Sequence, residues 1–429
     1  MSAARDTVPG PGPAASPAPA AAAPSHARQD SFAVRADCLQ VGGMDLTMLA
    51  ERVGRTPFYA YERGAVRQRV AALRAALPAG VRLHYAMKAN PMPALLALMA
   101  GLIDGIDVAS GGELQGALDT TMPPARISFA GPGKSDGELR RAVAAGVLVN
   151  VESAPELERI ALVGERLGRT PRVALRVNPD FELKHAGMKM GGGARQFGTD
   201  AEAVPELLRR TGQLGLDFEG LHIFSGAQNL SAAALAEAQE KSVRLALRLA
   251  RAAPSPLRTL NIGGGFGVPY FPGERALDLG ALGAALQAAQ ALLEWESPQT
   301  ALVLELGRFL VAEAGLYVCR VIERKSSRGK VFLITDGGLH HHLAASGNFG
   351  QVIRKNYPVA IGNKMVGESR ERVSVVGPLC TPLDLLADEL EMARAEAGDL
   401  VVVFQSGAYG LTASPTAFLG HPAPPEVLV

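Results

Sequence analysis

The chain has 429 residues, of which 48% are hydrophobic and 20% are charged, and its formal net charge is +1 at pH 7. This length predicts two domains, one of them large, with enough apolar material for a sizeable core. The balanced charge and the lack of a long basic run argue against nucleic acid or a membrane surface as a partner. Only three cysteines occur, and no apolar run could span a bilayer, so we expect a protein of the reducing cytoplasm.

Residues 1–30 differ in composition from the rest of the chain. Alanine and proline dominate, as in Pro9-Gly10-Pro11-Gly12-Pro13. Proline interrupts helices, and the segment lacks the apolar centre of a signal peptide. We therefore expect a disordered Ala/Pro-rich tail.

From residue 63 onward, short apolar runs alternate with longer amphipathic ones. The apolar runs predict strands over 81–87, 105–109, 126–130, 148–151, 172–177, 218–224, 259–262 and 301–304. The amphipathic runs predict helices over 63–76, 94–100, 113–119, 138–145, 154–167, 203–211, 232–252 and 279–294. Eight strands separated by helices favour an α/β fold with a parallel (β/α)8 TIM-type barrel, with a doubly wound sheet as the alternative.

After Gly307 the pattern changes. Runs over 316–322, 330–335, 372–376 and 400–404 are typical of strands, but no regular helices separate them. They predict a C-terminal antiparallel β domain, to which the run over 32–46 could add a strand. The predicted organisation is a barrel over 57–308 and a β domain formed by 31–56 plus 309–429.

Lys88 follows the first predicted barrel strand, in the sequence Lys88-Ala89-Asn90-Pro91. Burial at the end of a strand removes water from an ammonium group and favours the neutral amine. A fixed neutral amine can form a Schiff base with an aldehyde cofactor. The alternative is a strand-end lysine that simply reaches solvent.

Other polar residues also fall at the carboxyl ends of predicted strands. They are Asp107 after the second strand, His222 and Ser225 after the sixth, the glycine run with Gly264, Gly265 and Gly267 after the seventh, and Glu305 with Arg308 after the eighth. Barrel enzymes keep their chemistry at this face and often bind phosphate after strands seven and eight. Glycine lets backbone N–H groups approach an anion closely, and arginine adds a charged fork. The simpler alternatives are a structural Glu305–Arg308 ion pair, and a core role for His222 and for Cys380.

The triplet His340-His341-His342 raises the question of a metal site. Consecutive side chains do not converge on one ion, and no zinc-binding motif accompanies them. We predict no metal, and the role of the triplet stays open.

Taken together, these motifs resemble the fold-type III pyridoxal-phosphate decarboxylases, the family of diaminopimelate, ornithine and arginine decarboxylases. The resemblance runs from about residue 57 to residue 429, and the order of the motifs makes it specific. The motifs are Tyr85-Ala86-Met87-Lys88-Ala89-Asn90, Asp107-Val108-Ala109-Ser110-Gly111-Gly112-Glu113, Arg176-Val177-Asn178-Pro179, His222-Ile223-Phe224-Ser225, the glycines of 263–267, Glu305-Leu306-Gly307-Arg308, Gly377-Pro378-Leu379-Cys380 and Gly407-Ala408-Tyr409.

The resemblance implies a role for each matching residue. Lys88 would hold pyridoxal 5'-phosphate as an internal aldimine, His222 would stack on its ring, and Glu305 would pair with the pyridine nitrogen. The cofactor phosphate would be held by Ser225, Gly265, Arg308 and Tyr409, and Asp107, Gly264 and Gly267 would also lie at the cofactor. The protein would be a homodimer with shared active sites, in which Cys380 enters from the second subunit and protonates the carbanion.

Glu305 bears on the reaction type. Loss of carbon dioxide leaves an electron pair on Cα, and a carboxylate that keeps the pyridine nitrogen protonated helps the ring to accept it in a quinonoid intermediate. Alanine racemases of the same architecture carry an arginine at this place. The resemblance therefore implies a carboxy-lyase acting in amino-acid metabolism.

The substrate region departs from the familiar members. Thr381 stands where they carry an acid after the cysteine, although Asp384 is nearby, and residues 339–348 contain neither acid nor arginine. Arg308, Thr381 and Asp384 are the predicted substrate contacts. The pattern is most similar to a bacterial branch associated with exosortase gene clusters, whose relatives act on amino acids tethered to acyl carrier proteins. A diaminopimelate decarboxylase and a catalytically silent regulatory protein are the alternatives.

Overall fold

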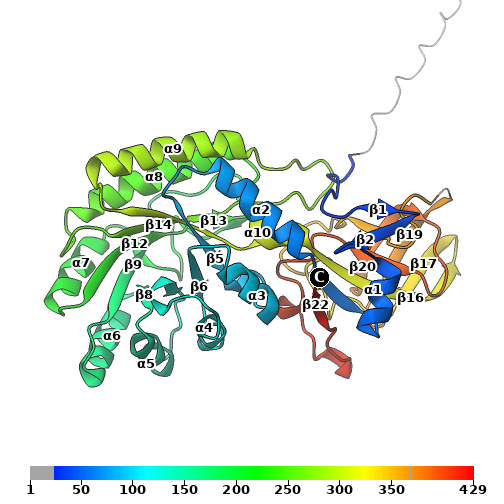
Figure 1. Cartoon of the computed structure of the whole chain (residues 1–429), viewed down its shortest axis with the longest axis horizontal. Helices are drawn as coiled ribbons and strands as arrows, with labels where there is room; N and C mark the ends of the chain where they lie inside the picture. Colours follow the sequence, from blue (N-terminus) through cyan, green and yellow to red (C-terminus); the bar gives the residue numbers. More distant parts are fainter. Residues whose placement is uncertain (1–23, 368) are drawn as a thin grey trace, which may run out of the picture.

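A computed structural model describes residues 24–367 and 369–429. Figure 1 shows a barrel with its helices on one side and a sheet domain on the other, with the C-terminus between them. The predicted fold class is therefore confirmed. No helix within the described ranges is long and apolar enough to cross a membrane.

Eight parallel strands close into the barrel. They pair in the cyclic order β5-β6-β7-β8-β9-β12-β14-β15, and β15 returns to β5. Their bounds are β5 (Arg82–Ala86), β6 (Gly105–Val108), β7 (Ile127–Phe129), β8 (Leu148–Val151), β9 (Arg172–Asn178), β12 (Asp217–Ile223), β14 (Thr259–Gly264) and β15 (Ala301–Leu306). All eight predicted strands are present, because each is an apolar run that the barrel buries on both faces.

Helices surround the barrel and connect successive strands. They are α2 (Arg63–Ala76), α3 (Pro93–Ala100), α4 (Gly111–Leu118), α5 (Asp136–Ala145), α6 (Ala154–Leu167), α7 (Val204–Gln213), α8 (Ala232–Ala250) and α9 (Leu279–Glu296), followed by the short α10 (Arg308–Val311). Side chains cap several of them: Ser110, Ser135 and Ser153 each accept an N–H of the first turn. Such a cap stabilises a helix by about 1 kcal/mol and fixes where the strand-to-helix loop ends.

The second domain is built around an eight-stranded sheet. Its main path is β18-β21-β16-β17-β19-β20, and β4 pairs with both β16 and β22. The strands are β4 (Phe58–Tyr61), β16 (Gly315–Ser327), β17 (Lys330–Thr335), β18 (Val359–Ile361), β19 (Arg370–Val376), β20 (Leu385–Ala393), β21 (Leu400–Val403) and β22 (Glu426–Leu428). Most pairs are antiparallel as predicted, whereas β17–β19 and β4–β22 are parallel.

The segment before residue 57 adds small elements to this domain. Strands β1 (Val34–Arg35), β2 (Cys38–Val41) and β3 (Met44–Asp45) form a three-stranded sheet, and helix α1 (Leu46–Val53) follows. Because β4 joins the second sheet, the chain enters the β domain before it enters the barrel. The predicted division at 57 and 308 stays a prediction.

Only the end of the predicted tail lies within the described residues, and the prediction for 1–23 lies outside them. The backbone oxygen of Ser25 accepts the N–H of Gly273 at 2.9 Å, and a ring nitrogen of His26 lies 2.8 Å from the backbone oxygen of Asn356. Residues 24–30 thus contact both domains, which the alanine- and proline-rich composition did not predict.

Candidate active site

Three predicted site residues meet at the carboxyl end of the barrel. Lys88 lies in the single 3-10 turn Met87–Ala89 that follows β5, and its Nζ is 3.8 Å from Glu305 Oε1 on β15. His222 Nε2, from β12, lies 3.1 Å from Glu305 Oε2. The ring N–H does not point along this contact, so both ring nitrogens of His222 lack a hydrogen-bond partner although the residue is 2% exposed. The contact is therefore close and electrostatic rather than a directed hydrogen bond.

The opposite charges of Lys88 and Glu305 stabilise each other. Burial lowers the pKa of Lys88, but the adjacent Glu305 carboxylate outweighs that effect and leaves the pKa above its ordinary value. Burial raises the pKa of Glu305, but the neighbouring His222 ring and Lys88 ammonium hold it below its usual range. The expectation that burial makes this amine neutral is therefore wrong for the free side chain. The side chain is 43% exposed and faces a carboxylate.

Asp107 lies deeper in the barrel. Its Oδ1 is 3.1 Å from His84 Nδ1 and accepts the hydroxyl of Ser128, whose own oxygen accepts Asn150 Nδ2 at 3.2 Å. Its Oδ2 is buried without a hydrogen-bond partner. A buried, half-satisfied carboxylate is costly, so Asp107 has a free acceptor for a polar group.

The glycine run forms a crowded turn after β14. Gly265 has φ +77°, and a Cβ there would lie 2.6 Å from the backbone oxygen of Gly226. A Cβ on Gly264 would lie 2.4 Å from the backbone oxygen of Glu305. Gly267 donates its N–H to the backbone oxygen of Asn229 at 2.9 Å, which counts against that N–H binding a cofactor. The neighbouring Ser225 is buried.

Arg308 and Tyr409 line the same pocket as Lys88 and Gly265. The guanidinium lies 4.5 Å from the ring centroid of Tyr409 and donates to the hydroxyl of Tyr270 at 3.1 Å. Burial lowers the pKa of Arg308, but the facing tyrosines raise it above its ordinary value. Tyr409 belongs to the β domain and donates its N–H to Ala89 at 2.8 Å. No Glu305–Arg308 ion pair forms between these described residues, so the simple structural reading of that motif does not apply.

A cavity of about 420 Å³ extends from Lys88 and Arg308 toward the β domain. Most of its lining was missed from the sequence, although Phe224 stands inside the His222–Ser225 motif, and Met188 and Met190 lie between β9 and β12. Tyr357 and Phe349 come from a distant part of the chain and carried no local signal. The remaining lining residues are Gly187, Ala227, Gln228, Tyr270, Phe271, Ala344, Gly350, Gln351 and Tyr409.

Three other predicted residues lie away from this cavity within the single chain. Cys380 is exposed, and Thr381 Oγ1 accepts the N–H of Leu383 at 3.3 Å. Asp384 is buried, and its two oxygens accept the N–H groups of Leu339 at 2.6 Å and Leu379 at 2.9 Å. These bonds hold the Asp384 carboxylate against its own backbone and count against a substrate contact.

The histidine triplet is buried in the β domain. His341 and His342 have separate partners: His341 Nε2 lies 3.1 Å from the backbone oxygen of Pro422, and His342 Nε2 lies 2.9 Å from Ser406 Oγ. Both ring nitrogens of His340 lack partners. Among residues 24–367 and 369–429, no three potential ligands gather as a metal site would require.

The arrangement at the barrel end fits pyridoxal phosphate. Lys88 offers the amine, Glu305 a carboxylate suited to a pyridinium, and the unpartnered His222 ring a flat surface. The glycine turn leaves no room for a side chain, and Arg308 adds positive charge near it. These are the groups that such a cofactor needs, so the fold and the site define a pyridoxal-phosphate-binding barrel.

Comparison with known proteins gives the family. A family model described as "Pyridoxal-dependent decarboxylase, pyridoxal binding domain" matches residues 63–312. The chain is 38% identical to the L-glutamyl-[BtrI acyl-carrier protein] decarboxylase of Niallia circulans, over 90% of this chain and 91% of the relative. It is 33% identical to the diaminopimelate decarboxylase of Aquifex aeolicus, over 91% of this chain and 90% of the relative.

Solved structures agree with this result. The diaminopimelate decarboxylase of M. jannaschii in complex with L-lysine superposes with a TM-score of 0.85 at 26% identity, over 94% of this chain and 93% of that one. The chain belongs to the pyridoxal-phosphate-dependent decarboxylases, the family its motifs resembled. It is a carboxy-lyase that uses pyridoxal 5'-phosphate.

Proposed function

We propose that the enzyme decarboxylates an amino acid whose far end carries no charge and is attached to an acyl carrier protein. The cavity beside Lys88 carries this proposal. Among the lining residues whose side chains the structure describes, only Lys88 and Arg308 are charged, and apolar and aromatic groups such as Met188, Phe271 and Phe349 also line the cavity. A free distal ammonium would need a carboxylate there, because an unpaired buried charge costs several kcal/mol.

The relative with 38% identity acts on a glutamyl group carried by an acyl carrier protein, and this supports the proposal. Residues 339–348, where related enzymes hold a distal charge, contribute only Ala344 to the cavity. Diaminopimelate decarboxylase activity is the competing proposal, since 33% identity to such an enzyme also exists. It requires a carboxylate and a second arginine for the distal groups, and the described lining supplies no carboxylate and no arginine besides Arg308.

The chemistry is divided among the residues of the site. When bound, the cofactor supplies an electron-poor ring that accepts the electron pair left on Cα as carbon dioxide departs. Lys88 binds its aldehyde, Glu305 holds the proton on the pyridine nitrogen, and His222 supports the ring face. Arg308 and Tyr409, with Ser225 and the amides of the glycine turn, hold the phosphate, while Arg308 also orients the substrate carboxylate.

We further propose a cytoplasmic homodimer with shared sites. Cys380 is exposed and lies outside the cavity of its own chain. In this arrangement the partner subunit's Cys380 reaches the cavity and delivers a proton from Sγ to Cα, and the neighbouring Thr381 faces the substrate.

A carbon dioxide release assay tests the substrate proposal. Glutamyl-loaded acyl carrier protein, free glutamate, ornithine, lysine and meso-diaminopimelate are supplied to the holoenzyme under identical conditions. We expect the carrier-bound amino acid to react and the three free diamino acids to react at least about a hundredfold more slowly, as a missing charge partner requires. Efficient turnover of free meso-diaminopimelate, with kcat/KM of about 10⁴ M⁻¹s⁻¹ or above, would overturn the proposal.

A further inference from the structure

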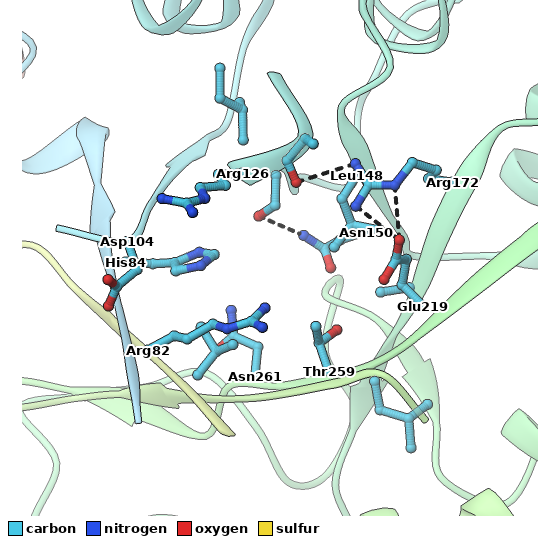
Figure 2. Close-up of a pocket in the computed structure, with 16 residues that line it drawn as sticks. Arg82, His84, Asp104, Arg126, Leu148, Asn150, Arg172, Glu219, Thr259 and Asn261 are labelled. Atoms are coloured by element: carbon cyan, nitrogen blue, oxygen red, sulfur yellow. Dashed lines mark hydrogen bonds and ion pairs between the residues drawn. The ribbon is translucent and has the colours of Figure 1, made fainter. Parts of the chain in front are cut away.

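A second cavity opens at the opposite, amino-terminal end of the barrel (Figure 2). Its volume is about 240 Å³, and its lining comes from the first residues of the strands, including Arg82, Leu148, Arg172 and Thr259. Lys88 and Glu305 lie at the other ends of these strands. The cavity is therefore separate from the catalytic site and shares no lining residue with it.

Arginines dominate the charge of this cavity. Arg82, Arg126 and Arg172 face two carboxylates, Asp104 and Glu219, so three positive groups against two negative ones leave one positive charge. Figure 2 shows Arg82, His84 and Arg126 along the same side of the cavity. Arg82 and Arg126 are exposed, so a dissolved anion can reach them, and a cleft with an excess of positive charge raises the local concentration of anions.

The carboxylates are already committed. Glu219 binds Arg172, whose Nε donates at 2.8 Å, and Arg172 also donates to the backbone oxygen of Gly146 at 3.0 Å. Asp104 Oδ2 accepts from Arg74 at 2.7 Å and from the N–H of Leu83 at 2.7 Å. Neither carboxylate forms an ion pair with Arg82 or Arg126 among the described residues.

The side chains of Arg82 and Arg126 make no hydrogen bond, ion pair or ring contact with any described part of the chain, and only their backbones are bonded. Two unpaired guanidinium groups directed into one cavity repel each other, and a shared anion removes that repulsion. His84 adds a third donor. Burial lowers the pKa of His84, but the Asp107 carboxylate at 3.1 Å raises it above its ordinary value.

We propose that this cavity binds a small dianion, either inorganic phosphate or sulfate or an organic dicarboxylate, between Arg82, Arg126 and His84. Guanidinium groups bind such oxyanions through paired N–H donors. The neutral side chains of Asn150, Thr259 and Asn261 also line the cavity and suit the remaining oxygens. A volume of 240 Å³ holds the anion with several waters, since one water occupies about 30 Å³ of liquid.

The test is titration calorimetry on the holoenzyme, so that the cofactor already occupies the catalytic phosphate site. Sulfate, phosphate and succinate are titrated against chloride at matched ionic strength. We expect one saturable dianion site per chain, and the separate titrants distinguish an inorganic from an organic ligand. In Arg82→Gln and in Arg126→Gln, affinity should fall about tenfold or more, the loss expected for one charge-assisted bond.

The matched control is Arg67→Gln, which removes an equally exposed and unpartnered arginine from α2. It should bind the dianion as the unaltered protein does. Arg82→Lys keeps the charge and should retain more affinity than Arg82→Gln, which separates loss of binding from loss of fold. Absence of saturable binding, or binding that both glutamine variants leave unchanged, would overturn the proposal.

Discussion

Lys88 Nζ lies 3.8 Å from Glu305 Oε1, although the two residues are far apart in the sequence, because β5 and β15 are the neighbours that close the barrel. The first and last strands therefore place the amine and the carboxylate side by side. The pair holds the pKa of Lys88 above and that of Glu305 below its ordinary value, so both are charged before the cofactor arrives.

Glu305→Gln should leave the cofactor bound but reduce kcat by about a hundredfold or more, as loss of a positioned proton-holding group does. The amide occupies the same space but cannot stabilise a proton on the pyridine nitrogen. Single-turnover decarboxylation and the cofactor absorbance measure the two effects separately. Glu51→Gln, an exposed change on α1, is the control. An unchanged kcat would show that Glu305 does not act on the ring.

Gly265→Ala should weaken cofactor binding about tenfold or more, because the new Cβ would lie 2.6 Å from the backbone oxygen of Gly226. Gly215→Ala is a matched control: Gly215 also has positive φ, +65°, but nothing lies within 4 Å of its Cβ position. Gly215→Ala therefore introduces the same kind of backbone strain without a steric clash of the new Cβ. Fluorescence titration measures the affinity of each variant for the cofactor. Equal affinities in the two variants would contradict a cofactor-holding role for this turn.

The shared-site proposal predicts complementation between inactive variants. Lys88→Ala and Cys380→Ala should each lose nearly all activity as homodimers. Mixed subunits should regain up to about a quarter to a half of the unaltered rate, because one of the two sites in a heterodimer has both residues. The measurement is carbon dioxide release after subunit exchange, followed by native mass spectrometry. A mixture that contains heterodimers and stays inactive would contradict the shared site.

His342 predicts an acid-dependent loss of stability. Burial lowers its pKa from 6.5 to about 3, so between these pH values the unfolded chain binds a proton at this histidine and the folded chain does not. The contribution of neutral His342 to the free energy of unfolding is present above pH 6.5. It is lost as the pH falls from 6.5 toward about 3, at up to about 1.4 kcal/mol per pH unit. Urea unfolding between pH 7 and 4 should therefore show a shallower pH dependence for His342→Gln than for the unaltered protein. His185→Gln, at an exposed site, is the control. Identical slopes would contradict the effect.

The barrel could be predicted from the sequence because its signals are local. Each strand is a short apolar run, and serine caps such as Ser135 mark where the next helix begins. The barrel residues of the candidate site could be expected near one another for the same reason, because they stand at strand ends that a barrel brings together. Lys88, His222 and Glu305 needed only the strand order to be placed near one another.

The β domain was predicted less completely because its signals are not local. Strand β20 reads Leu-Leu-Ala-Asp-Glu-Leu-Glu-Met-Ala, a composition that favours helix, and its pairing with β19 makes it a strand. Strands β4 and β22 pair across almost the whole length of the chain. The aromatic lining from Phe349 and Tyr357 depends on the same distant contacts. No pattern within the loop indicated that these rings reach the cavity.

The attachment of the cofactor tests the central claim most directly. The barrel also holds a deeply buried lysine, Lys134, whose side chain is 1% exposed and pairs with Glu156 at 2.8 Å. Borohydride reduction of the holoenzyme, followed by peptide mass spectrometry, fixes the cofactor to the lysine that holds it. The structure predicts the label on the peptide that contains Lys88 and no label after Lys88→Ala. A label on Lys134 or on any other lysine would contradict the placement of the active site at the carboxyl end of β5.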